Sequence, residues 1–379
     1  MDFNNLSMPE LSEVTIGFIP LTDCAPIVVA SRMGFDKKYG LKINLSREAS
    51  WAAIRDKLIS GDLHAAHSLY GMIYGVALGI GGQEKSLSVL MTLNQNGQGI
   101  TLSNQLRSAG VDSGAELKTY LTQQKEKLTF AQTFPTGTHA MWLYYWLASH
   151  DIHPLQDIKT TVVPPSQMVA TLRSGSVAGY CAGEPWNARA VYDNVGFTIA
   201  TSQDVWEDHP EKVLGVTAEF ADLYPKTCRA MVMAILDACR YLDVMANREK
   251  VSDLLAAPDL IDAPKQIIHD RFIGKYDNGN GKEWQDTHPI KFFNNGTVNF
   301  PYLSDGMWFT TQFKRWGLLK TDPDHLAIAQ KINRVDLYTE AAEALEITVP
   351  NQLMRSSKLM DGVVWDGNDP VGYTNSFKF

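Results

Sequence analysis

The sequence predicts an α/β protein built from two lobes that face each other across a ligand cleft. Short apolar strands alternate with helical stretches over the first 205 residues, which is the pattern of open sheets covered by helices. From about residue 218 onward the pattern becomes mainly helical, most clearly over 228–246. At 379 residues the chain is long for one core, so two domains are expected.

The first unit of the chain is predicted as strand, loop, helix, strand. Val14–Ile19 is an apolar run, and a polar turn at Thr22–Asp23 follows it. An apolar-periodic helix then ends near Gly34, and Leu41–Leu45 forms the next strand. Because crossover connections are right-handed, this unit predicts two parallel strands in one sheet.

The same alternation continues along the chain. Ser50 and Ser166 are predicted to cap the helices that follow them, and Thr138 is predicted to open a third helix. Helices are expected at 51–59, 138–146 and 167–173, and strands at 87–93, 127–134, 159–165, 177–183 and 196–202. This alternation favours open parallel sheets.

Two segments, 89–103 and 196–206, are suited to cross between the lobes. Open α/β sheets bind ligands outside the carboxyl ends of their strands, so two lobes joined by crossing strands enclose a cleft. This is the type II periplasmic-binding-protein architecture. The expected boundaries are 14–98 for the first part of lobe one, 99–205 for lobe two, and 206–379 for the second part of lobe one with a helical C-terminal extension.

Composition narrows the class of function. The formal charge is −8 and no Lys/Arg-rich block is present, which argues against direct nucleic-acid binding. No window reaches the roughly 18 apolar residues of a membrane span. The first 14 residues lack the pattern of a signal peptide, so a cytoplasmic location is expected. The four cysteines have no CxxC spacing and are expected to be reduced core thiols.

Several predicted helix starts carry polar or aromatic residues, which predicts a site for an anion. Helix N-termini present unpaired N–H groups and a partial positive charge, and several of them aimed at one point bind an anion with little formal charge. Each start by itself is more often an ordinary cap or turn, and only the four together make a binding site an equal alternative. The starts lie in "REASWAAIRD", "TFPTGTHAMW", "VPPSQMVATL" and "AGEPWNARAV".

Other chemistry is not indicated. His64 and His67 lack a third metal ligand at suitable spacing, so no metal is expected. The stretch "YDNGNGKEW" is predicted to be a hairpin turn. No nucleophile elbow, P-loop, HExxH or carboxylate pair at fixed spacing is present, and no cofactor motif either. The sequence predicts a binding protein and not an enzyme.

Seven stretches in the same order over nearly the whole chain resemble the nitrate- and bicarbonate-binding protein family. They are "VTIGFIPLTDCAPIVVASRMGF", "LSREASWAAIRDK", "TFPTGTHAMWLYYWLA", "VVPPSQMVATLRSG", "YCAGEPWNARAV", "HPEKVLGV" and "DGMWFTTQFKRWG". The resemblance implies an anion held between the lobes. The ligand-binding residues expected are Trp51, Asn96, Thr136, Gly137, Lys212, Thr133 and His67, with Gly183, Glu184 and Trp186 as the wall of the cleft.

The resemblance also indicates which anion is expected. Lys212 matches a charge-compensating lysine, whereas bicarbonate binders carry an acidic residue and a metal ion there, so nitrate or nitrite is expected. Asn96 replaces a glutamine and Thr136 a histidine of the transport proteins. A lone lysine is more often exposed to solvent, and Trp51 is equally a candidate for the core. Glu184 is expected to hold loop N–H groups across the cleft.

Within the family, "FIPLTDCAP", "LSREASW" and "YCAGEPWN" are most similar to nitrate/nitrite sensors of the NasS type and to the sensor domain of NrtC. This sequence has no ATPase domain, so the NasS type is expected. The resemblance implies a cytoplasmic sensor that controls an RNA-binding antitermination protein of the NasT type. The alternative is a periplasmic nitrate-binding component of an ABC importer whose signal peptide has been removed. A biosynthetic enzyme on the same fold is a third possibility, without a catalytic motif to support it.

Overall fold

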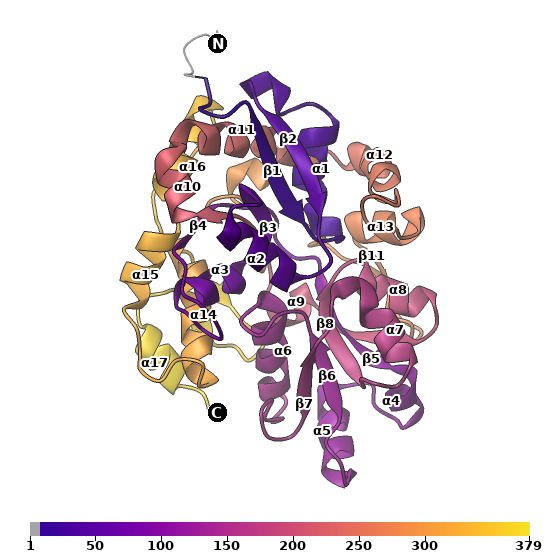
Figure 1. Ribbon diagram of the computed structural model, residues 1–379. Helices are drawn as coiled ribbons and strands as arrows, with labels where there is room; N and C mark the ends of the chain where they lie inside the picture. Colours follow the sequence, from indigo (N-terminus) through magenta and orange to yellow (C-terminus); the bar gives the residue numbers. More distant parts are fainter. Residues whose placement is uncertain (1–7) are drawn as a thin grey trace.

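The computed structural model describes residues 8–379, so the first seven residues, which entered the prediction of location, lie outside the described part. Two five-stranded sheets form two lobes, one above the other in Figure 1. The sheet of lobe one has the order β2-β1-β3-β10-β4, and that of lobe two has the order β7-β6-β8-β5-β9. The predicted two-lobed α/β class is therefore confirmed.

Both sheets are mixed, whereas the alternating pattern favoured parallel ones. In lobe one β10 runs antiparallel to β3 and β4, and in lobe two β5 runs antiparallel to β8 and β9. These two strands, β10 and β5, are the first ones formed after the chain crosses from the other lobe. Their direction cannot be read from local periodicity. The strands of lobe one are β1 (Glu13–Phe18), β2 (Lys42–Arg47), β3 (Ala65–Leu69), β4 (Leu87–Thr92) and β10 (Lys212–Thr217). Those of lobe two are β5 (Gln98–Ser103), β6 (Thr129–Gln132), β7 (Lys159–Val162), β8 (Gly179–Gly183) and β9 (Gly196–Thr201).

The helices of the first 223 residues cover both sheets. Ser50 caps α2 as predicted, because its hydroxyl accepts the N–H of Ala53 at 3.2 Å, and the helix ends at Gly61 with φ 85°. Ser166 makes no cap, since it lies inside a 3-10 turn, η4 (Pro165–Gln167). These helices are α1 (Ala25–Arg32), α2 (Trp51–Ser60), α3 (Tyr70–Ala77), α4 (Asn104–Ser108), α5 (Gly114–Gln123), α6 (Thr138–Ser149), α7 (Met168–Arg173), α8 (Trp186–Tyr192), α9 (Ser202–Val205) and α10 (Ala218–Leu223).

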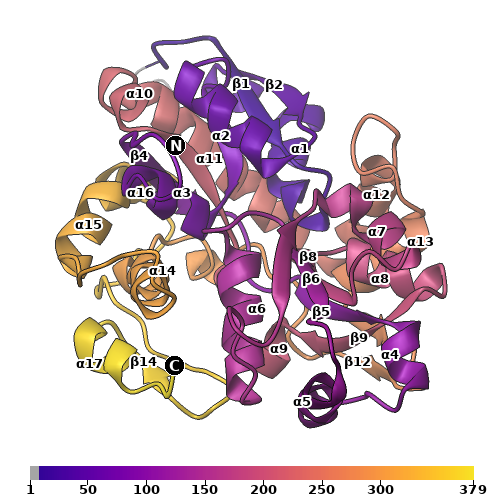
Figure 2. The same ribbon diagram turned by 60° about the horizontal axis from the view of Figure 1, so that its bottom comes forward.

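The C-terminal part is mainly helical, as predicted, and it contacts both lobes. Thr198 of β9 donates its N–H to the carbonyl of Asn278 at 2.9 Å, and Tyr145 of α6 donates to Asp361 at 2.7 Å. Figure 2 shows α17 and the C-terminus near the end of α6. The helices are α11 (Pro225–Asp243), α12 (Met245–Leu255), α13 (Lys265–Phe272), α14 (Leu303–Arg315), α15 (His325–Ile332), α16 (Val335–Ala344) and α17 (Pro370–Asn375). The predicted hairpin is confirmed as β11 (Lys275–Asp277) with β12 (Glu283–Gln285), and a second short pair is β13 (Ser357–Lys358) with β14 (Val364–Trp365).

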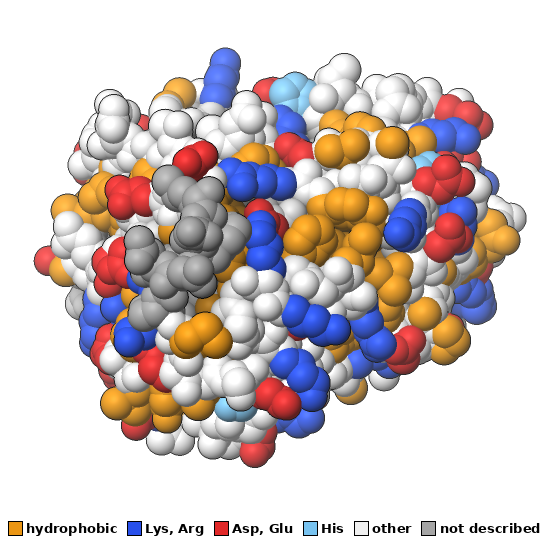
Figure 3. All heavy atoms as spheres, turned by 90° about the horizontal axis from the view of Figure 1, so that it is seen from above, with side chains coloured by type: hydrophobic (Ala, Val, Ile, Leu, Met, Phe, Trp, Pro, Cys, Tyr) orange, Lys and Arg blue, Asp and Glu red, His pale blue; other side chains and the backbone are white. Residues whose placement is uncertain are grey.

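The cysteines lie in the interior, and the surface is mixed in charge and polarity. All four cysteines are buried and free, as predicted, and burial raises the pKa of the Cys228 thiol to about 12. Within residues 8–379 the helices are too short or too polar to cross a bilayer. The face of the molecule seen from above carries acidic and basic side chains interspersed with apolar ones (Figure 3).

Candidate functional site

A buried cluster of charged side chains surrounds Lys212, the first residue of β10. The Lys212 ammonium donates to Asp23 at 2.7 Å and forms a second ion pair with Glu211, and none of the three side chains is exposed. A lone lysine is more often exposed to solvent, but this one is not. The lysine is part of the sheet and of the protein interior.

The charge of this cluster is fixed by its surroundings. Burial disfavours the Lys212 ammonium, but Asp23 and Glu211 outweigh that effect and raise the pKa of the lysine. Burial disfavours the Glu211 carboxylate too, yet Lys212 and His139 hold its pKa well below the usual range. The cluster therefore contains one ammonium between carboxylates.

Two histidines extend the cluster in opposite directions. His67 of β3 lies with Nε2 2.8 Å from Asp23, and His139 of α6 lies with Nε2 3.0 Å from Glu211. Burial lowers the pKa of both rings in spite of the carboxylates beside them. The order His67–Asp23–Lys212–Glu211–His139 leads from lobe one to lobe two, since only His139 belongs to the second lobe.

Trp51 forms one side of the cluster. It is the first residue of α2 and is fully buried, with its ring 5.5 Å from the His67 ring and 5.7 Å from the Lys212 Nζ. Its indole N–H has no hydrogen-bond partner among the described residues. The indole N–H groups of Trp142, Trp206 and Trp316 are also buried without a partner among the described residues, so it is the position beside Lys212 that suits the Trp51 N–H to bind a ligand atom.

The turn between β8 and α8 brings lobe two against the cluster. A side chain added at Gly183 would lie 3.4 Å from Asp23 Oδ2. The Glu184 carbonyl accepts the N–H of Thr22 at 2.8 Å, and the Trp186 indole donates to the carbonyl of Pro20 at 2.9 Å. These are the three residues expected as the cleft wall, and they join the lobes.

The Glu184 side chain differs from the role expected for it. One carboxylate oxygen accepts the N–H of Ala188 in the following helix, α8, at 3.0 Å, and the other pairs with Arg271 of α13 at 3.1 Å. The contact across the junction is made by the Glu184 backbone. The carboxylate instead joins lobe two to the C-terminal part of the chain.

The expected Thr136–Gly137 turn also contacts lobe one, beside α3. A Cβ at Gly71 would lie 2.2 Å from the Thr136 carbonyl oxygen, so glycine is needed for this approach. The Thr136 hydroxyl is buried without a partner among the described residues. Nearby, Thr133 lies with its hydroxyl 2.8 Å from Nδ1 of His139.

The Asn96 side chain forms its hydrogen bonds with residues outside the Lys212 cluster. It has a left-handed backbone with φ 66°, and its carboxamide donates to Asp208 at 3.2 Å and to the carbonyls of His288 and Pro289. Its carbonyl accepts from Asn94, whose own side chain accepts the N–H of Lys212. The structure thus places Asn96 in the crossing segment, where it organises the backbone before β10.

Asp23, Glu211 and His139 belong to the cluster but were not predicted from the sequence. Each lies in a stretch that carried the resemblance, next to Thr22, Lys212 and Thr138 respectively. Adjacent residues of a strand normally point to opposite faces, so burial of both Glu211 and Lys212 was not foreseeable from periodicity. A lysine directly after a glutamate at the start of an apolar run was the available signal.

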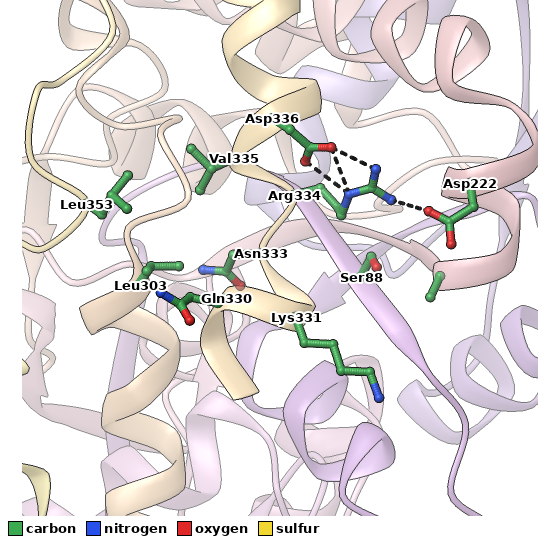
Figure 4. A pocket seen from close by; sticks show the side chains of 11 residues that line it. Ser88, Asp222, Leu303, Gln330, Lys331, Asn333, Arg334, Val335, Asp336 and Leu353 are labelled. Carbon is green, nitrogen blue, oxygen red and sulfur yellow. Dashed lines mark hydrogen bonds and ion pairs between the residues drawn. The ribbon is translucent and has the colours of Figure 1, made fainter. Parts of the chain in front are cut away.

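Of the four predicted helix starts, those of α2, α6 and α8 border the cluster through Trp51, His139 and Gly183. The fourth start leads into η4 and α7, which packs against α8. Two other features lie apart. Figure 4 shows a pocket of lobe one whose Arg334 is paired with Asp222 and Asp336. The side chains of Glu207, Asp208 and His288 lie close enough together to hold a metal ion. The Lys291 ammonium already supplies a positive charge there, 2.7 Å from Asp208.

Known proteins share this sequence and fold. Residues 7–256 match the NMT1-like family. The chain is 38% identical to the nitrate import ATP-binding protein NrtC of Synechocystis sp., covering 97% of this chain and 55% of NrtC. It is 36% identical to the nitrate/nitrite binding protein NrtA of the same organism, covering 98% of this chain and 86% of NrtA.

The fold agrees as well. The crystal structure of the periplasmic nitrate-binding protein NrtA from Synechocystis PCC 6803 superposes with a TM-score of 0.94 at 36% identity, over 98% of this chain and 100% of that one. This confirms the predicted periplasmic-binding-protein-like architecture. The chain belongs to the NMT1-like family and is a relative of the NrtA-type binding proteins.

Proposed function

We propose that the protein binds a monovalent oxyanion, nitrate or nitrite, at the junction of the lobes beside Lys212 and Trp51. The observation that carries the proposal is a fully buried ammonium next to an indole N–H that has no partner within residues 8–379, in a chain related to nitrate/nitrite binding proteins. An ammonium and a neutral N–H donor are suited to an oxyanion that accepts hydrogen bonds through several oxygens.

The site disfavours divalent anions. Lys212 already faces two carboxylates, so each negative charge on the ligand adds to an excess of buried negative charge, and a divalent anion adds twice as much as a monovalent one. In isothermal titration calorimetry we expect nitrate and nitrite to bind at least about 100-fold more tightly than sulfate. Sulfate affinity equal to that of nitrate would contradict this assignment of the ligand, and chloride of equal ionic strength is the control.

The NrtA-type relatives favour one physiological setting. NrtA is named a periplasmic nitrate-binding protein and NrtC a nitrate import ATP-binding protein, and this chain matches nearly all of the first and 55% of the second. We therefore favour the reading as a nitrate-binding component of an importer over the sensor reading. The contacts of Glu184 and Trp186 with lobe one support ligand capture by lobe closure.

The sensor reading stays a prediction that rests on three sequence stretches. If the chain controls an antitermination protein of the NasT type, partner and anion must change each other's affinity by the same factor. We then expect nitrate to bind more weakly when such a partner is present, measured by calorimetry with and without it. Equal nitrate affinities in the two titrations would rule the sensor role out and leave the importer role standing.

A further inference from the structure

The cluster of Lys212, Asp23 and Glu211 has too little positive charge to balance a bound anion. One ammonium lies between the carboxylates of Asp23 and Glu211, all fully buried. A monovalent anion beside Lys212 would add a further negative charge to an environment that already has an excess of one. Buried charge without a partner is strongly disfavoured, so the liganded site needs one more positive charge.

Two arginines, Arg271 and Arg355, do not supply this charge. Arg271 pairs with Glu184 at 3.1 Å, and Arg355 pairs with Asp305 at 2.7 Å. Each guanidinium is thereby matched to a buried carboxylate of its own. The groups in contact with these carboxylates that can become positive are the two histidines, His67 and His139. Burial lowers the pKa of the neighbouring His209 to about 3, so that ring stays neutral.

We propose that the anion enters this site together with one proton, and that His139 takes up that proton. The inference rests on the proposed oxyanion function and deepens it, because it makes the proton a second ligand of the same site. The proton goes to Nδ1 of the imidazole, while Nε2 continues to face Glu211. The imidazolium then supplies the missing positive charge.

The hydrogen-bond partners of the two rings distinguish them. Nδ1 of His67 faces the backbone N–H of Ile19 at 3.5 Å, which can only donate. A proton on that nitrogen would place two donors against each other. Nδ1 of His139 faces the hydroxyl of Thr133 at 2.8 Å. A hydroxyl both donates and accepts, so Thr133 can rotate and accept a hydrogen bond from the new N–H.

His139 is neutral before the anion arrives. Its ring is fully buried, and it lies in the first turn of α6, where the helix dipole disfavours a cation. The charged groups that face it are Glu211, Lys212 and Asp23, and His209 is the further titratable ring nearby. Burial lowers the pKa of His139, although the carboxylates oppose this effect. A bound anion adds negative charge and raises that pKa.

The sign of the pH dependence follows from this linkage. Because the liganded form holds the proton more tightly than the free form, binding takes up protons and affinity rises as the pH falls. Between the two pKa values, nitrate affinity should change about tenfold for each pH unit. The change levels off below the pKa of the free protein, where His139 is protonated in both forms.

Calorimetry of the full-length protein tests the proton directly. Nitrate is titrated at about pH 7 in two buffers that differ in their enthalpy of ionisation, and the slope of the measured enthalpy gives the protons taken up. We expect close to one proton per nitrate in the wild-type protein. Nitrate binding without proton uptake overturns the inference and leaves the proposed function standing. Absence of nitrate and nitrite binding at every pH from about 5.5 to 8.5 overturns both.

Two variants assign the proton to its residue. His139→Gln keeps a neutral donor toward Glu211, so its residual affinity for nitrate should not vary with pH and its proton uptake should vanish. His153→Gln, outside the site, should keep the uptake of the wild type. Uptake that persists in His139→Gln places the proton on another group and overturns the assignment. If that variant fails to fold, nitrogen NMR of the wild-type histidines decides, since only His139 should become doubly protonated on adding nitrate.

Discussion

Replacing Lys212 by methionine should abolish nitrate binding and destabilise the protein at the same time. The substitution keeps most of the side-chain volume but leaves Asp23 and Glu211 as buried carboxylates without their ammonium partner. Removing one partner of a buried ion pair typically costs about 3–5 kcal/mol. We expect a loss of this size in the free energy of unfolding, measured by urea denaturation, and at least about a 100-fold loss in nitrate affinity.

Matched variants separate the charge effect from packing. Lys125→Met, at an exposed position, should change stability by no more than about 0.5 kcal/mol. Adding Glu211→Gln to Lys212→Met removes one of the orphaned charges and should recover part of the stability without restoring binding. Lys212→Arg should recover only part of the affinity, since a planar fork replaces a point charge. A folded Lys212→Met protein that binds nitrate within about threefold of the wild type would refute the site.

Replacing Arg271 by methionine should weaken the connection between lobe two and the C-terminal part of the chain. Arg271 pairs with the buried Glu184 carboxylate, donates to the Lys275 carbonyl at 2.7 Å and lies over the Tyr276 ring. Its removal leaves Glu184 buried and charged, so we expect a loss of about 3 kcal/mol in the free energy of unfolding. Because the Glu184 backbone holds Thr22 across the junction, nitrate affinity should fall as well.

The comparison with an exposed arginine makes this prediction specific. Arg173→Met removes an ion pair in which the arginine side chain is 55% exposed and leaves Asp193 paired with Arg189, so it should cost less than about 1 kcal/mol. Combining Arg271→Met with Glu184→Gln should be less destabilising than the sum of the two single variants, because the orphaned charge is gone. Additive effects in this double-mutant cycle would show that the Arg271–Glu184 pair does not couple the two parts.

The local structure of this protein was determined by its sequence. The polar turn after β1, the Ser50 cap of α2, the hairpin of β11 and β12, and the free cysteines all follow from neighbouring residues. Hydrophobic periodicity, capping side chains and glycines act over a few residues, so a single sequence displays them. The resemblance to the nitrate- and bicarbonate-binding family, and not a local pattern, predicted a site between the lobes with Trp51, Gly183 and Lys212 among its residues.

Only the tertiary structure decided what surrounds Lys212. Asp23 and His67 reach it from other elements of lobe one, while His139 approaches Glu211 from lobe two. The strand direction of β10 and the burial of both Glu211 and Lys212 depend on chain segments more than 100 residues apart, and no local pattern records such pairings. Whether a lysine is a solvated surface charge or a buried member of an ion-pair cluster is set by what packs around it. In this protein Lys212 is buried because the two lobes pack together around its cluster.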